Sequence, residues 1–239
     1  MPNATESDRR LPTVLLILTA MTGVVDAVSF LGLGHVFTAN MTGNVVFIAF
    51  AVAGAPSLSI PRSTTAFAAF LAGAVVRGRM AVGMRPAGQA RRASIAFGIE
   101  AALLAGATAV AMGVSSANAQ ESTSLYAVII LTAIAMGIRN AVVRKLGVPD
   151  LTTTVLTLTI TGLASDSSLA GGSNPRWQRR VASIVLMFGG AAVGTLLLRH
   201  SLALPLALAA FSSFSGALML YRGRQPSGSE MLATQGGAK

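Results

Sequence analysis

The chain has 239 residues, of which 53% are hydrophobic and only 11% are charged. About a quarter of the residues in soluble domains are charged, so this composition excludes a typical soluble fold. The net charge of +10 comes from 18 Lys and Arg residues against 8 Asp and Glu residues. Because the basic residues lie almost wholly in short gaps between apolar runs, they indicate membrane orientation, and we expect no nucleic-acid partner.

The chain lacks the residue patterns of common enzymes and metal sites. It has no cysteine, and its two histidines, His35 and His200, lie far apart. The sequence contains no His-Glu-x-x-His, no Gly-x-Ser-x-Gly and no phosphate-binding Gly-x-x-x-x-Gly-Lys. We therefore expect no enzymatic activity, no cofactor and no metal ion.

Apolar segments recur along nearly the whole chain, and about 20 apolar residues span a bilayer. We expect a cytoplasmic tail at 1–10, one all-α membrane domain at 11–222 and a disordered cytoplasmic tail at 223–239. Arg9 and Arg10 before the first segment are reminiscent of a signal peptide, but that segment is too long and contains Asp26, which favours a retained span. The expected segments are 12–33, 36–54, 63–82, 93–113, 123–143, 150–165, 179–198 and 201–221.

The first four segments resemble the last four, which predicts two repeated halves at about 11–113 and 123–222. Gly-Val-Val-Asp-Ala-Val aligns with Gly-Ile-Arg-Asn-Ala-Val and places Asp26 against Asn140. Threonine-rich stretches follow in both halves. Further on, Arg62 and Phe-Leu-Ala-Gly-Ala-Val match Arg180 and Phe-Gly-Gly-Ala-Ala-Val at a constant offset.

The second and sixth segments are unusually polar. A helix through Thr38, Asn40, Thr42 and Asn44 would be polar all round and could not face lipid. The sixth segment contains threonines at 152, 153, 154, 157, 159 and 161, whose β-branched side chains disfavour a helix. Both patterns predict broken or re-entrant segments, which membranes tolerate when they are buried in protein or line a cavity.

Counting basic residues on each side of the membrane supports this reading. Eight crossings would divide the 18 Lys and Arg residues nine to nine, whereas six crossings divide them sixteen to two. We therefore predict about six full spans plus two broken segments, with both termini cytoplasmic. Three crossings in each half would make the halves inverted. A seven-crossing alternative, with the N-terminus outside, gives fourteen to four.

Four stretches carry a resemblance to the YoaK-like family of uncharacterised bacterial membrane proteins. They are Asp26-Ala-Val-Ser-Phe30, Asn40-Met-Thr-Gly-Asn44, Gly137-Ile-Arg-Asn-Ala141 and Thr153-Thr-Val-Leu-Thr157. The resemblance covers about residues 10–222 and implies a multi-pass protein of the bacterial inner membrane, with about six spans and no established activity. Arg139 and Leu158 depart from the uncharged amide and the small residue expected there.

Three ionisable residues inside predicted spans are candidate site residues, because charge is costly there. Asp26 shares a helical stripe with Thr19, Thr22 and Ser29 and is either a proton or substrate site or a hydrogen-bonded link between helices. Glu100 either relays protons, pairs with a cation or makes an interhelical hydrogen bond. For Arg139 we favour snorkelling to the cytoplasmic surface, with pairing to Asp26 or Glu100 or binding of an anionic solute as alternatives.

Neutral polar residues of the broken segments are the candidates for lining a pathway. They are Asn40, Thr42, Asn44, Thr153 and Thr157, which either line a pathway or satisfy the broken backbone. Asn140 is expected to hydrogen-bond the facing broken segment.

The sequence as a whole predicts a small-solute transporter or channel in the lipid bilayer. A non-transporting membrane protein for assembly, sensing or partner binding is the alternative, and a homodimer is possible in either case.

Overall fold

The computed structural model describes residues 6–83, 89–113, 123–147 and 156–222, and these residues form helices with short connections. Six helices are long and two are short. The long helices are α1 (Glu6–Ala27), α3 (Ile60–Gly83), α4 (Gln89–Met112), α5 (Thr123–Leu146), α7 (Trp177–Leu198) and α8 (Ala203–Arg222), and the short ones are α2 (Met41–Val52) and α6 (Leu156–Ser165). A π-helical turn (Val28–Gly32) extends α1, and a 3-10 turn (Ser168–Ala170) follows α6.

The long helices match the predicted membrane spans. Five of them are long and apolar enough to cross a bilayer, and α3 has 24 residues but carries Arg62, Arg77 and Arg79, which lower its hydropathy. The short helices α2 and α6 have 12 and 10 residues. At 1.5 Å per residue they are about 18 and 15 Å long, too short for a hydrocarbon core of about 30 Å. The chain is a polytopic helical membrane bundle.

Two sequence expectations about helix ends need correction. The first helix begins at Glu6, within the stretch expected to be a tail. The second helix begins at Met41, so Thr38 and Asn40 precede it and do not share helical stripes with Thr42 and Asn44. The chain reverses direction at Gly34 and His35, which have φ angles of 83° and 58°, and these left-handed conformations cannot continue a helix.

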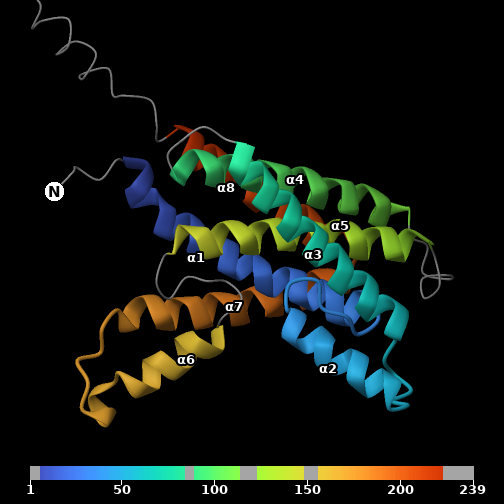
Figure 1. Ribbon diagram of the computed structural model, residues 1–239, viewed down its shortest axis with the longest axis horizontal. Helices are drawn as coiled ribbons and strands as arrows, with labels where there is room; N and C mark the ends of the chain where they lie inside the picture. The colour runs from blue at the N-terminus through green and yellow to red at the C-terminus, as the bar shows by residue number, and fades with distance from the viewer. Residues whose placement is uncertain (1–5, 84–88, 114–122, 148–155, 223–239) are drawn as a thin grey trace, which may run out of the picture.

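The long helices pack in consecutive pairs. Helix α1 packs against α7 and α8, α3 against α5, and α4 against α5 and α8. Leu15, Leu18, Phe97, Ile138 and Leu220 form a buried core between α1, α4, α5 and α8. The short helices pack on long ones, α2 on α3 and α6 on α7, and Figure 1 shows them at opposite ends of one face of the bundle.

Glycines bring two helix pairs into backbone contact. In the α1–α7 pair, a Cβ atom at Gly23 would collide with the Met187 carbonyl, and one at Gly190 would collide with the Ala20 carbonyl. The α3–α5 pair has the same arrangement, in which Gly137 lies on the Phe70 carbonyl and Gly73 on the Ile134 carbonyl. Small residues allow such close approach where lipid supplies no hydrophobic driving force.

The adjacent glycines Gly189 and Gly190 allow a matched test of this packing. We expect Gly190→Ala to destabilise the bundle by about 1–3 kcal/mol, because the new methyl group meets backbone that cannot rotate away. Gly189 has no atom within 4 Å of a built Cβ, so Gly189→Ala should keep or slightly raise the stability. Thermal unfolding in detergent, followed by circular dichroism, measures both. Equal effects of the two substitutions would contradict the packing.

Candidate functional site

The reversal between α1 and α2 is closed by one buried amide. Oδ1 of Asn44 accepts a hydrogen bond from the Phe37 backbone N–H at 2.9 Å, and its Nδ2 donates to the Phe37 carbonyl at 2.5 Å. The amide therefore pairs with a peptide group as a neighbouring strand would. Of the two roles considered for Asn44, satisfying the broken backbone is the one that the structure shows.

Aromatic rings pack the same reversal onto α2. Phe30 contacts His35 edge-on at a centroid distance of 5.0 Å and stacks on Phe37 at 5.3 Å. Phe37 in turn stacks on Phe47 of α2 at 5.5 Å. This aromatic cluster and the Asn44 amide fix where α2 begins, and hence where Asn40 and Thr42 lie.

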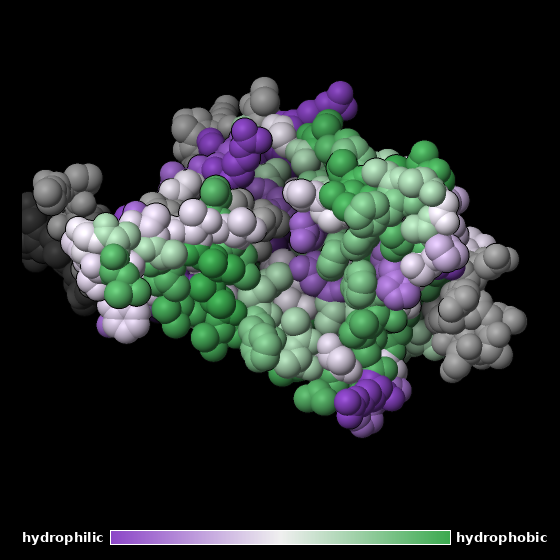
Figure 2. Space-filling model, turned by 90° about the horizontal axis from the view of Figure 1, so that it is seen from below, coloured by the Kyte–Doolittle hydropathy of each residue, from purple (hydrophilic) through white to green (hydrophobic). Residues whose placement is uncertain are grey.

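A central cavity of about 500 Å³ lies between the N-terminal ends of α2 and α6. Figure 2 views the bundle from the side of the short helices and shows a hydrophilic depression between apolar surfaces. Four predicted site residues line this cavity: Asp26, Asn40, Thr42 and Thr157. The remaining wall residues are Thr22, Ala39, Gly43, Val46, Phe47, Leu156, Ile160 and Met187. Thr153 lies outside the described residues.

Asp26 is the one ionisable residue of the central cavity wall among the described residues. Its Oδ1 atom is buried and makes no hydrogen bond to the described part of the chain. The other polar residues of its predicted stripe, Thr19, Thr22 and Ser29, are 0 to 2% exposed, so the stripe faces the bundle interior as expected. A buried carboxyl oxygen without a protein partner is available to a proton, a cation or a solute donor.

A second cavity of about 850 Å³ adjoins the first and shares Ala39, Asn40 and Thr42 with it. We call it the basic-end cavity, because Arg144 and Lys145 line it near the end of α5. Asn140 lines it too.

Contrary to the expectation, Asn140 makes no hydrogen bond to the described residues of either broken segment. Nδ2 of Asn140 donates to the Met136 carbonyl of its own helix at 2.8 Å. A side-chain amide can donate to the carbonyl four residues earlier in its own helix, because that oxygen has a second lone pair.

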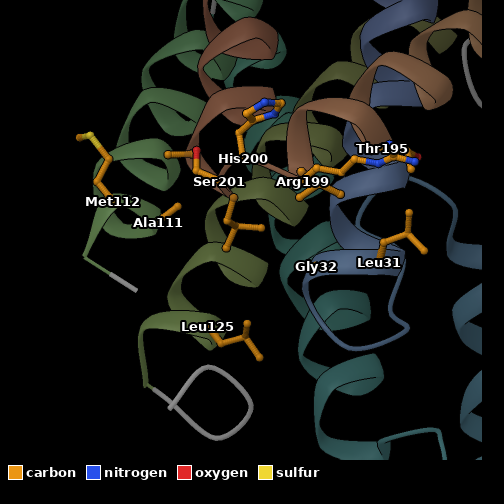
Figure 3. A pocket seen from close by; sticks show the side chains of 12 residues that line it. Leu31, Gly32, Ala111, Met112, Leu125, Thr195, Arg199, His200 and Ser201 are labelled. Atoms are coloured by element: carbon orange, nitrogen blue, oxygen red, sulfur yellow. The ribbon is translucent and has the colours of Figure 1, made fainter. Parts of the chain in front are cut away.

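A third cavity, of about 730 Å³, lies at the other end of the bundle. Figure 3 shows it between the π-helical turn with Leu31 and Gly32, Leu125 of α5, and Arg199 and His200 at the turn between α7 and α8. It shares no lining residue with the other two cavities, so protein separates it from the central cavity.

Arg139 lies in the centre of the bundle, so the expectation that it snorkels is wrong. The residue is 0% exposed, and all five of its N–H groups have acceptors. Nε donates to Oε2 of Glu100 at 3.0 Å, and Nη2 donates to Oε1 of Glu100 and to Ser213 Oγ. Nη1 donates to the Leu18 carbonyl at 3.0 Å and to Thr22 Oγ1 at 3.1 Å. Pairing with Glu100, one of the alternatives, is what the structure shows.

This ion pair joins four helices, because its partners come from α1, α4, α5 and α8. Its two charges cancel, so it leaves no net charge beside the central cavity. Thr22 belongs both to the pair and to the cavity wall, so one hydroxyl group separates the pair from the cavity. Sequence reasoning missed Ser213 and the Leu18 carbonyl, since neither belongs to a readable pattern.

The comparisons with known proteins agree with this architecture. A family described as "Protein of unknown function (DUF1275)" matches residues 14–220. The chain belongs to this family. It is also similar to the UPF0700 transmembrane protein YoaK of Bacillus subtilis (strain 168), with 32% identity over 156 residues, which are 65% of this chain and 67% of that protein. No solved structure matches the chain. The resemblance predicted from the Asn40–Asn44 and related stretches is confirmed.

The Arg139–Glu100 pair predicts a specific stability pattern. Arg139→Met leaves the Glu100 carboxylate buried without a counter-charge and should lower the stability by about 3–5 kcal/mol. The double variant Arg139→Met with Glu100→Leu removes both charges and should recover most of that loss. The unfolding temperatures of the wild type, Arg139→Met and the double variant in detergent measure these effects. Arg144→Met, at an exposed position on the same helix, is the control. Wild-type stability of Arg139→Met would refute the burial.

Proposed function

We propose that this protein moves a small polar solute across the bacterial inner membrane through the central cavity between α2 and α6. The observation that carries the proposal is the central cavity itself. Asn40, Thr42 and Thr157 line it at the starts of the two short helices, and Asp26 of α1 lines it too. Many secondary transporters place their binding site at broken helices of this kind.

Inverted halves are part of the proposal, and the helix pairs support them. The α1–α7 and α3–α5 pairs use glycines at corresponding positions, and the two short helices leave the centre toward opposite ends. Burial along α3 at Ser63, Ala66 and Gly73 recurs along α7 at Arg180, Ser183 and Gly190. In this alignment Arg180 corresponds to Ser63. The sequence comparison instead matched Arg180 with Arg62, the residue before Ser63.

Charge supports an orientation with both termini in the cytoplasm. In Figure 1, α1 starts at the same end of the bundle at which α5 finishes and α7 starts. Most described basic residues lie at that end, whereas Arg62 and Arg199 lie at the other. Positive loops face the cytoplasm, so the basic-end cavity would open inward from the central cavity.

The cavity walls favour a neutral or cationic solute. Hydroxyl and amide groups and one carboxyl line the central cavity, and no basic side chain is among its described wall residues. A volume of about 500 Å³ is within the range of small-molecule sites, about 300–1,000 Å³. Asp26 would bind the cation or exchange a proton with the solute, and the neutralised Arg139–Glu100 pair would not repel either.

Adjacent residues on α6 test whether the cavity is a water-accessible pathway. The chain has no cysteine, so single cysteines can be introduced at Thr157, on the cavity wall, and at Leu158, an outward residue that is 69% exposed. We expect a membrane-impermeant thiol reagent to label Thr157→Cys and to spare Leu158→Cys, which would face lipid. Failure to label Thr157→Cys from either side of the membrane would favour the non-transporting alternative.

Asp26→Asn tests the role of the carboxyl directly. In proteoliposomes we expect the wild-type protein to show solute-driven flux for at least one compound in a panel of amino acids, polyols and quaternary amines, and we expect Asp26→Asn to abolish that flux. The substitution keeps the side-chain shape, so thermal stability should change little. Asp166→Asn, which alters an acid outside the central cavity, is the control. Unchanged flux in Asp26→Asn would remove the carboxyl from the mechanism.

A further inference from the structure

Two arginines, Arg77 near the end of α3 and Arg92 near the start of α4, have buried donor atoms. Arg77 of α3 is 3% exposed, and its Nε and Nη1 atoms are buried without a hydrogen-bond partner in the described part of the chain. Nε of Arg92, on α4, is buried and unpartnered in the same way. Arg77 lies six residues before the end of α3 and Arg92 three residues after the start of α4, so their like charges lie at the same end of the bundle. We call Arg77 and Arg92 the arginine pair.

This arrangement contrasts with the other buried arginine, Arg139, whose every N–H group has an acceptor. Buried guanidinium N–H groups without acceptors, as at Arg77, are costly, and a second positive charge at the same end of the bundle adds to the cost. Orientation by the positive-inside rule requires basic residues near this end, but exposed positions such as Arg79 and Arg91 already satisfy it. Burial of the arginine pair needs another reason.

We propose that the arginine pair binds the phosphate group of an anionic ligand between α3 and α4, with an anionic phospholipid as the source. Planar guanidinium groups donate paired N–H groups to phosphate oxygens, and a shared anion would cancel the repulsion between them. Basic pockets between spans on the cytoplasmic side are typical sites for lipid headgroups.

The surface beside the arginine pair favours a lipid over a soluble phosphate. Within two turns before Arg77, α3 exposes Leu71, Val75 and Val76, which are 48 to 52% exposed. An apolar face that leads up to a charged end matches a lipid, whose acyl chains would lie along α3 while its phosphate reaches the guanidinium groups. Exposed Arg79 and Arg91 flank the pair and add positive potential.

Neighbouring residues supply matched controls for the test. The double variants Arg77→Gln with Arg92→Gln and Arg79→Gln with Arg91→Gln remove the same charge from the same two helices, but only the first removes buried groups. Purified full-length protein in neutral detergent is titrated with phosphatidylglycerol, with phosphatidylcholine or with inorganic phosphate. The shift in unfolding temperature and lipid retention in native mass spectrometry are the readouts.

We expect phosphatidylglycerol, and not phosphatidylcholine, to stabilise the wild-type protein and the Arg79/Arg91 variant. In the Arg77/Arg92 variant the apparent affinity should fall about tenfold or more. Without lipid this variant should be as stable as the wild type, because uncompensated charge has been removed. A stabilisation by inorganic phosphate alone, lost in the same variant, would keep the phosphate site and overturn the lipid source.

Two results would overturn the site itself. One is an equal loss of the lipid effect in both double variants, which would reduce it to general charge attraction. The other is destabilisation of the Arg77/Arg92 variant in the absence of lipid, which would mean that the chain itself satisfies these arginines. If the double variant fails to fold, the single variant Arg92→Gln, at a half-buried position, is compared with Arg91→Gln in the same titration.

Discussion

The requirement that every backbone N–H and C=O group in hydrocarbon finds a partner governs this structure. Six long helices meet it within themselves. The two short helices interrupt the pattern, so side chains and packing must supply what the interrupted backbone lacks. Asn44 does so by pairing with the Phe37 peptide, and Arg180 ties α6 to α7 by donating at 2.5 Å to the Gly162 carbonyl, which also accepts from the Asp166 N–H. The interruptions are therefore built features, and they hold open the polar centre of the bundle.

Three sets of ionisable residues inside the bundle differ in how many hydrogen-bond partners they have. The Arg139–Glu100 pair is fully satisfied, whereas Asp26 has a buried oxygen and the arginine pair has buried donors that find no partner among the described residues. The first case shows that this fold can neutralise a buried charge completely when it is structural. The other two are then places where a partner from outside the described chain is expected, and buried ionisable groups in membranes commonly mark such sites.

Sequence patterns predicted the spans and the cavity lining but not individual partners. The polar starts of the second and sixth segments identified the short helices and three residues of the central cavity, Asn40, Thr42 and Thr157, and the depth of Asp26 in the first span identified the fourth. The position of Arg139 was predicted wrongly because the sequence shows how far it lies from the end of its helix but not which other helices cover it. Asn140 was misjudged because its own helix offers an acceptor. The break between the first two expected segments fell at Gly34 and His35, but the positive φ angle of His35 could not be predicted from its residue type.

The matched positions Asp26 and Asn140 show where the proposed halves differ in chemistry. Asn140 donates to its own helix and lines the basic-end cavity, while Asp26 at the central cavity has an oxygen with no partner among the described residues. A perfectly symmetric pair of halves would present the same group to both sides of the membrane. One carboxyl in one half instead gives the centre a single titratable site. In the proposed inverted arrangement, both orientations of the pathway would share that one site, as alternating access requires.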